Sequence, residues 1–186
     1  MTEYSKIRNV AVYLGSADDV RPAFRQAVVD FAEFLAANDM TLIFGGSCCG
    51  MMKLLGDTML RRGGRAVGVF TRCLPERLFR ADLTETVITE TLAERKAEML
   101  RRADAAVALP GGLGTFDELF DALAQKKLGA VNCPVGVLNV EGFFDPLLDL
   151  LARSHAAGFT SPHAMSLLCS ASTPAELLLL FAQEKK

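Results

Sequence analysis

The stretch Pro110-Gly-Gly-Leu-Gly-Thr-Phe-Asp-Glu118 decides the fold. It directly follows an apolar run at residues 105–109, which predicts a buried strand, and it leads into an amphipathic pattern that predicts a helix. A glycine-rich turn between a strand and a helix is typical of phosphate sites, because the backbone approaches the anion closely and the first helical N–H groups point at it. Glu118 follows within one helical turn. The stretch therefore predicts a bound phosphate with a carboxylate beside it, as chemistry on a phosphorylated sugar would require.

Strand-like and helix-like segments alternate along the whole chain. The apolar runs predict strands at residues 10–14, 41–44, 66–70, 84–89, 105–109, 134–138 and 165–169, with helices between and after them. Continuous apolar strands indicate a parallel sheet covered by helices on both faces. The predicted fold class is α/β, a Rossmann-like doubly wound sheet, in one domain spanning residues 1–186.

Three glycine turns follow predicted strands, and they are expected to line one crevice. They are Gly15-Ser16, Gly45-Gly46-Ser47 and Gly111-Gly112-Leu113-Gly114. Ligands of such sheets bind beyond the carboxyl ends of the strands. The dinucleotide fingerprint Gly-x-Gly-x-x-Gly is absent from the first turn, which argues against a dinucleotide-dependent oxidoreductase.

Composition excludes several classes of protein. Apolar residues make up 51% of the chain, yet no run approaches the roughly eighteen residues that cross a bilayer. The N-terminal segment lacks the apolar core of a signal peptide, so a soluble, cytoplasmic protein is expected. The net charge is −2 with both signs mixed, which predicts no nucleic-acid surface. Five cysteines without Cys-x-x-Cys spacing favour reduced thiols over disulfides or a metal site.

Two motifs have a structural as well as a functional interpretation. Thr115-x-x-Glu118 has the spacing of a helix capping box, although a cap alone does not require three preceding glycines. Glu94-Arg95-Lys96 is typical of a solvated helix surface, but Arg95 lies near a predicted helix start at the crevice end of the sheet. A guanidinium there would bind a phosphate with two parallel hydrogen bonds.

The chain resembles the Lonely Guy family of cytokinin riboside 5′-monophosphate phosphoribohydrolases, whose members were often labelled lysine decarboxylases. The family signature Pro-Gly-Gly-x-Gly-Thr-x-x-Glu is matched at every fixed position of Pro110–Glu118, and the upstream Arg-Lys pair is matched by Arg95-Lys96. The match extends to Val12-Tyr-Leu-Gly-Ser16, to Phe44-Gly-Gly-Ser-Cys-Cys-Gly-Met-Met52 and to the segment 134–143, and it covers about residues 8 to 180.

The resemblance implies a Rossmann-like fold, a homodimer, a small-molecule nucleotide substrate and no metal or organic cofactor. It implies hydrolysis of a nucleoside 5′-monophosphate to a free base and ribose 5-phosphate, with Arg95 and Glu118 in the catalytic positions. Together with the glycine turns it nominates these substrate contacts: Ser16, Gly45, Gly46, Lys96, Gly111, Gly112, Leu113, Gly114, Thr115, Phe116 and Asp117.

Four departures from the family pattern make the base less certain than the reaction. They are Leu92-Ala93 for Met-His, Ser47 for a third glycine, Glu76-Arg77 for Arg-Glu, and Val131 for a histidine. An isoprenoid side chain needs an apolar pocket, for which Met51, Met52 and Met99 are candidates, and AMP is an equally reasonable substrate.

The expected mechanism places Glu118 beside C1′, where a carboxylate stabilises the oxocarbenium-like transition state and orients or deprotonates the attacking water. Arg95 is expected to hold the phosphate or the leaving portion. Two alternatives belong to other classes. A non-catalytic carrier of a nucleotide or phosphorylated pterin would share the glycine turn without needing Arg95 or Glu118. A pyridoxal-phosphate decarboxylase would need a Schiff-base lysine, with Lys53 or Lys96 as candidates.

Overall fold

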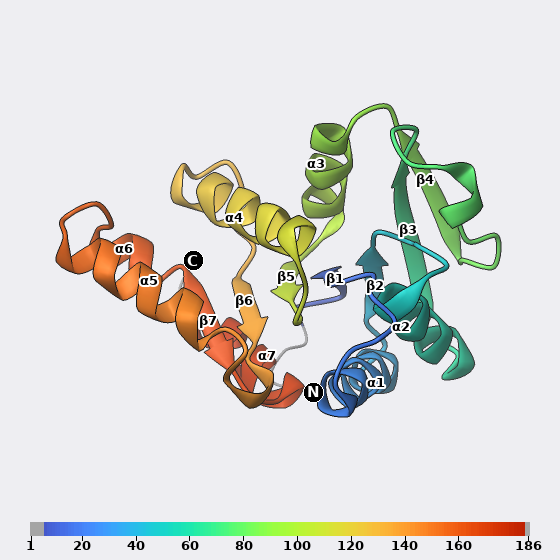
Figure 1. The fold of residues 1–186 in the computed structure, drawn as a ribbon, viewed down its shortest axis with the longest axis horizontal. Helices are drawn as coiled ribbons and strands as arrows, with labels where there is room; N and C mark the ends of the chain where they lie inside the picture. Colours follow the sequence, from blue (N-terminus) through green and yellow to red (C-terminus); the bar gives the residue numbers. More distant parts are fainter. Residues whose placement is uncertain (1–5, 185–186) are drawn as a thin grey trace.

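The computed structural model describes residues 6–184, and within them seven parallel strands form one sheet (Figure 1). Residues 1–5, part of the segment on which the absence of a signal peptide was argued, lie outside the described range. The strands are β1 (Asn9–Tyr13), β2 (Thr41–Phe44), β3 (Arg65–Thr71), β4 (Glu85–Thr89), β5 (Ala105–Ala108), β6 (Val135–Leu138) and β7 (Leu168–Ala171). The helices are α1 (Pro22–Ala37), α2 (Gly50–Arg61), α3 (Leu92–Arg102), α4 (Leu113–Lys127), α5 (Asp145–Ala156), α6 (Pro162–Met165) and α7 (Pro174–Gln183), with short 3-10 turns at Glu76–Leu78 and Val140–Gly142.

The strand order β4-β3-β2-β1-β5-β6-β7 confirms the predicted doubly wound α/β fold. The chain first builds outward from β1 to β4, then returns to the other side of β1 and builds outward again to β7. Val10 is therefore paired on one side with Leu42 and on the other with Ala105. The reversal between β1 and β5 is the topological switch point, where such sheets leave a crevice at the carboxyl ends of the strands.

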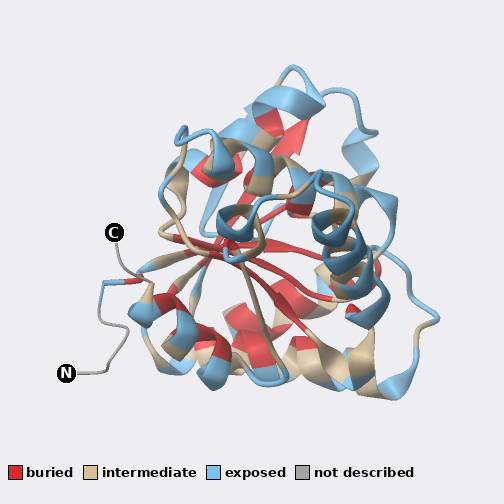
Figure 2. Ribbon diagram, turned by 90° about the vertical axis from the view of Figure 1, so that its left-hand side faces the viewer, coloured by how far each residue is buried: buried red, intermediate tan, exposed pale blue. Residues whose placement is uncertain are grey.

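Helices cover both faces of the sheet, as the apolar strands predicted (Figure 2). One face packs against α1, α2 and α7 through side chains such as Phe31, Leu55 and Leu177. The other packs against α3, α4 and the start of α5 through Met99, Leu119 and Phe144. Because β1, β2, β5 and β6 are buried on both faces, they read as unbroken apolar runs. No helix among the described residues combines the length and apolar character needed to span a membrane.

The prediction of a strand at residues 165–169 was wrong in position. Pro162–Met165 forms a helical turn, and β7 begins at Leu168. The side chain of Ser161 accepts a hydrogen bond from the backbone N–H of Ala164, and Pro162 occupies the first helical position. A serine cap followed by proline is a strong helix start, and it outweighs the apolar character of the residues that follow.

The loop after β2 packs tightly against the loop after β1, and this contact shapes the crevice. Gly50 has a φ of +55°, and a Cβ atom at this position would overlap the backbone carbonyl of Ser16. Only glycine satisfies both demands. Gly63, at the end of α2, also has a positive φ (+75°), but open space surrounds its Cα.

This pair of glycines allows a matched test of the loop contact. Gly63→Ala should lower the free energy of unfolding by about 1–2 kcal/mol, the cost of a side chain in the left-handed region. Gly50→Ala should lower the free energy of unfolding by about 1–3 kcal/mol more than Gly63→Ala does, because the new methyl group displaces the Ser16 loop. Urea unfolding of the two variants measures the difference, and equal losses would contradict the contact.

Candidate active site

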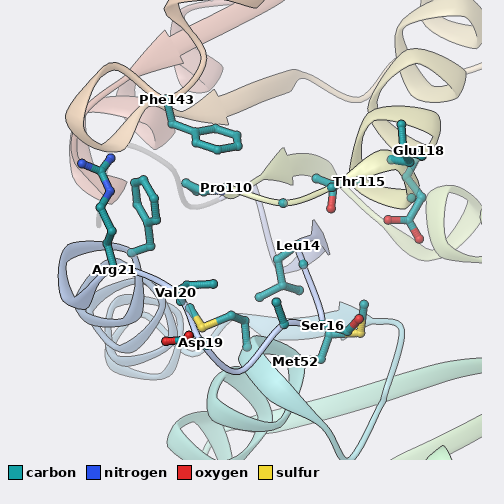
Figure 3. A pocket seen from close by; sticks show the side chains of 18 of the residues that line it. Leu14, Ser16, Asp19, Val20, Arg21, Met52, Pro110, Thr115, Glu118 and Phe143 are labelled. Carbon is teal, nitrogen blue, oxygen red and sulfur yellow. The ribbon is translucent and has the colours of Figure 1, made fainter.

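A cavity of about 700 Å³ opens at the carboxyl ends of the strands, across the switch point between β1 and β5 (Figure 3). Its walls come from the loops after β1, β3, β5 and β6 and from the first turns of α1, α2, α3 and α4. The lining residues are Leu14, Gly15, Ser16, Ala17, Asp19, Val20, Arg21, Phe24, Met51, Met52, Leu74, Arg95, Pro110, Gly111, Gly112, Leu113, Gly114, Thr115, Glu118 and Phe143.

Helix α4 begins earlier in the sequence than it would if Thr115 were its N-cap residue. Gly112 is the N-cap residue, the helix begins at Leu113, and no side chain caps its free N–H groups. The capping-box interpretation of Thr115 and Glu118 was therefore wrong, because both residues lie inside the helix. The Thr115 hydroxyl is buried, and it has no hydrogen-bond partner in the structure. A buried polar group without a partner is rare in folded proteins.

Arg95 and Glu118 form a buried ion pair in the wall of the cavity. Nη1 of Arg95 lies 2.8 Å from Oε1 of Glu118, and the two side chains are only 9% and 7% exposed. The Nε–H of Arg95 donates to the backbone carbonyl of Val69 in β3, also at 2.8 Å. The solvated-surface interpretation of Arg95 was therefore wrong. These two bonds use only two of the five N–H donors of the guanidinium, and Nη2 has no partner among the bonds of this pair.

Gly45 makes room for this pair. A Cβ atom on Gly45 would overlap Nη2 of Arg95 and would also lie 3.2 Å from the sulfur of Met52. The second glycine turn thus serves the site by its lack of a side chain, because the guanidinium lies directly against the backbone. Thr91 caps α3 by accepting a hydrogen bond from the N–H of Glu94, and this cap fixes where Arg95 projects from the helix.

Burial raises the pKa of Glu118 above its ordinary value, and the nearby charge of Arg95 opposes that shift. The carboxyl group is almost wholly removed from water, which disfavours its charged form. The guanidinium at hydrogen-bond distance favours the charged form. Glu118 is thus a carboxylate with increased basicity, and Arg95 is the main group that favours its charged form.

The cavity brings together some of the nominated residues and leaves out others. Ser16, Gly111, Gly112, Leu113, Gly114 and Thr115 line it beside Arg95 and Glu118, whereas Gly45, Gly46, Lys96, Phe116 and Asp117 do not. Lys96 instead forms an ion pair with Asp117 at 2.9 Å, and the Asp117 carboxylate is 62% exposed. Phe116 packs against the core under α4. Lys96 and Asp117 follow the buried Arg95 and the half-buried Phe116 along their helices, and helix periodicity turns them away from the cavity.

Several lining residues escaped the sequence reasoning. Arg21 and Phe24 lie at the start of α1, Leu74 follows β3, and Phe143 follows β6. The rule that ligands bind beyond the carboxyl ends of strands applied to these loops as well. Arg21, Phe24 and Leu74 have no glycine beside them, and Phe143 follows the single Gly142 and not a glycine-rich turn, so the search for glycine turns missed all four. Of the three methionines proposed for an apolar pocket, Met51 and Met52 line the cavity, whereas Met99 is in the core.

Comparison with known proteins identifies the family. A family model described as "Possible lysine decarboxylase" matches residues 52–180. A probable cytokinin riboside 5′-monophosphate phosphoribohydrolase of Oryza sativa subsp. japonica, LOGL1, is 38% identical over 91% of this chain and 76% of its own length. The Arabidopsis thaliana enzyme LOG2, which bears the same name without the qualifier, is 34% identical over 96% of this chain and 84% of its own length.

The chain belongs to the Lonely Guy family.

The fold is shared more widely than the family. A molybdenum cofactor carrier protein from Chlamydomonas reinhardtii superimposes with a TM-score of 0.67, covering 92% of this chain and 93% of its own, at 21% identity. This likeness shows the fold alone. The departures from the Lonely Guy pattern lie away from the cavity wall: Glu76 and Arg77 are exposed in a short 3-10 turn, and Ser47 pairs with Phe79. Ala93 and Val131 do not line the cavity either.

The balance of burial and charge at Glu118 is directly testable. Arg95→Gln should raise the pKa of Glu118 further, because the guanidinium is the strongest influence opposing the effect of burial. Lys96→Gln is the matched control, since Lys96 lowers the same pKa more weakly. Carbon-13 NMR titration of the glutamate carboxyl groups measures both shifts. A larger shift in the lysine variant would contradict the assignment.

Proposed function

We propose that the cavity hydrolyses the N-glycosidic bond of a nucleoside 5′-monophosphate, releasing a free base and ribose 5-phosphate. One observation carries the proposal: the buried Arg95–Glu118 pair lies in the wall of the same cavity as a helix start whose Thr115 hydroxyl has no partner. The names of the family relatives supply the chemical identity of the reaction. An anion site and a buried carboxylate in one cavity are what the reaction needs.

The phosphate binds at the glycine turn. The uncapped N–H groups at the start of α4 and the dipole of this 15-residue helix favour an anion there. The Thr115 hydroxyl, which has no partner within the protein, donates a hydrogen bond to a phosphate oxygen. Ser16, exposed in the loop after β1, is a second hydroxyl in the lining of the cavity.

Glu118 acts at C1′ of the ribose. As the bond between the base nitrogen and C1′ breaks, its electron pair leaves with the base, and positive charge develops on the sugar. The carboxylate stabilises that charge and accepts a proton from the water whose oxygen attacks C1′. Its raised pKa makes it a better base at neutral pH. The proton that Glu118 takes from the attacking water passes through solvent to the departing base, so one water is consumed and Glu118 is ionised again.

Arg95 holds Glu118 rather than acting as a free phosphate clamp. Its bonds to the Val69 carbonyl and to the carboxylate fix the direction of Glu118 before substrate arrives. Nη2 remains directed toward the Gly45 backbone. The binding energy of the phosphate, which lies away from the reacting bond, then holds C1′ against a carboxylate that is already oriented.

The base lies on the Arg95 side of the cavity, against apolar side chains. Met52 borders Gly45 and Arg95, and Leu74 follows β3 on the same side. This wall suits adenine, and it leaves an apolar surface for a prenyl group on the base. The alternative of a non-catalytic carrier draws support from the shared fold of the cofactor carrier protein. A carrier, however, has no need for a buried Arg95–Glu118 pair.

We also propose that the chain acts as one domain and as a cytoplasmic homodimer. One sheet runs through the described residues, and the five cysteines are all free thiols, which suits a reducing compartment. Along α4 and just after it, Leu113, Phe120 and Leu128 are exposed large apolar residues, and a second copy of the chain would cover them.

Replacing the carboxylate should stop the reaction without emptying the cavity. Glu118→Gln should lower kcat for base release from AMP by about 10²–10⁴-fold, because the amide neither stabilises the cationic sugar nor accepts a proton. Nucleotide affinity should persist when measured by calorimetry. Asp117→Asn, one position earlier and facing Lys96, is the control expected to keep its activity. Near-normal turnover in Glu118→Gln would refute the proposed role.

Removing the Thr115 hydroxyl should weaken nucleotide binding without lowering the stability of the fold. Thr115→Val should leave the free energy of unfolding unchanged or raise it by about 1 kcal/mol, because no hydrogen bond is lost. AMP affinity should fall by about tenfold, while adenosine affinity should stay the same.

Thr58→Val is the matched control for this prediction. The buried Thr58 hydroxyl accepts a hydrogen bond from Arg61 at 3.0 Å, outside the cavity. This variant should lose stability and keep its AMP affinity. A loss of stability without a loss of AMP affinity in Thr115→Val would remove Thr115 from the phosphate site.

A further inference from the structure

The cavity extends on both sides of the glycine turn, and the proposed reaction uses only one of them. Arg95 bonds to Val69 of β3 and abuts Gly45 after β2, so the catalytic pair lies over the ends of β2 and β3. The glycine turn follows β5, and Phe143 follows β6 on the far side. Figure 3 shows Glu118 at one end of the cavity, Phe143 and Arg21 at the other, and Pro110 and Thr115 between them.

The far end is a distinct aromatic space, which we call the distal compartment: Leu14, Val20, Arg21, Phe24 and Phe143. The rings of Phe24 and Phe143 meet edge to face with centroids 5.5 Å apart. The guanidinium of Arg21 lies 4.5 Å from the centroid of Phe24 and forms an ion pair with Glu141 at 3.0 Å. The compartment therefore has an apolar aromatic wall, with its charge held at the rim.

The loop that carries Phe143 is fixed from several directions. The side-chain oxygen of Asn139 accepts a hydrogen bond from the N–H of Phe144 at 2.8 Å, and its amide donates to Asp145 at 2.7 Å. The ring of Phe143 also packs edge to face on that of Phe144, which is fully buried. Glu141 is held at a φ of +49°, a conformation that non-glycine residues rarely adopt. The aromatic wall is thus preorganised.

The position of the phosphate determines what can enter this compartment. In the proposed function the nucleoside runs from the phosphate toward Glu118, so the distal compartment adjoins the phosphate on the side away from the ribose. A group that reaches it must be attached to the phosphate itself. We propose, on the basis of that function, that the site also binds nucleoside 5′-phosphodiesters, with a flat apolar group on the phosphate lying against Phe24 and Phe143.

The chemistry of the compartment selects the kind of group. Among the described residues that line the cavity, Arg21 and Asp19 are the charged ones near this end, and both are exposed at its rim. Arg21 already has Glu141 as a partner. A second charged group would therefore gain little, whereas an aromatic ring gains edge and face contacts with two phenylalanines.

The test compares two esters of equal charge. Adenosine 5′-(phenyl phosphate) and adenosine 5′-(methyl phosphate) both carry one negative charge, so their affinities differ by the ring alone. Calorimetry on the full-length Glu118→Gln protein avoids hydrolysis during the titration. The phenyl ester should bind about tenfold more tightly than the methyl ester, as burial of a ring predicts.

Substitutions in the compartment should remove this preference. In the same background, Phe143→Ala should bring the ratio of the two affinities close to one, and Phe143→Leu should lower it by a smaller amount. Phe159→Ala is the matched control, since that ring is 85% exposed outside the cavity, and it should keep the full ratio. Three results would overturn the inference. The two esters could bind with equal affinity, the ratio could stay unchanged in both Phe143 variants, or a protein that binds AMP could fail to bind either ester.

The outcome is separable from that of the proposed function. The unaltered protein could release base from AMP while the Glu118→Gln protein shows no preference for the phenyl ester. That result would refute the distal compartment as a binding site and would support the proposed hydrolase. A preference that depends on Phe143, without base release from AMP, would support the compartment and refute the hydrolase.

Discussion

The buried ion pair between Arg95 and Glu118 is the constraint on which the rest of the site depends. Removing two charges from water costs several kcal/mol for each ion, and only close contacts with good geometry recover that cost. Here the recovery comes from the 2.8 Å contact between the charges and from the Val69 carbonyl. A well-packed apolar pair would serve folding as well, so the pair is better explained by chemistry than by stability.

Several features of the surrounding fold follow from this pair. Helix α3 must begin directly after β4 for Arg95 to reach over the sheet, and the Thr91 cap sets that start. The turn after β2 must approach without a side chain, which requires glycine at position 45. On the other side of the glycine turn, Thr115 remains buried without a partner. The site thus combines a carboxylate that Arg95 already holds with a buried hydroxyl that makes no hydrogen bond to the protein.

The sequence predicted the fold and the centre of the site because both depend on local signals. Apolar runs identified the buried strands, and the segment Pro110–Glu118 contains the glycine turn and the carboxylate that line the cavity at the switch point. It failed where tertiary contacts decide the outcome. Thr115 and Glu118 have the spacing of a capping box, but the helix begins before them, at Leu113. Arg95 lies in a charged triplet, yet its burial follows from contacts with β3 and α4, which are distant in sequence.

The two sides of the switch point offer a ligand different chemistry, and the reason lies in the elements that face each side. On the β2 and β3 side, α3 and α4 project Arg95 and Glu118 over the strand ends, so a bond placed there meets charge that is already oriented. On the β6 side, the loop after the strand and the first turn of α1 present the rings of Phe143 and Phe24 instead. The nearest cation there, Arg21, is engaged by Glu141 at the surface, where water weakens its field. In the proposed function, a group bound on the β6 side therefore adds affinity and selectivity, while bond cleavage is confined to the side that holds the buried carboxylate.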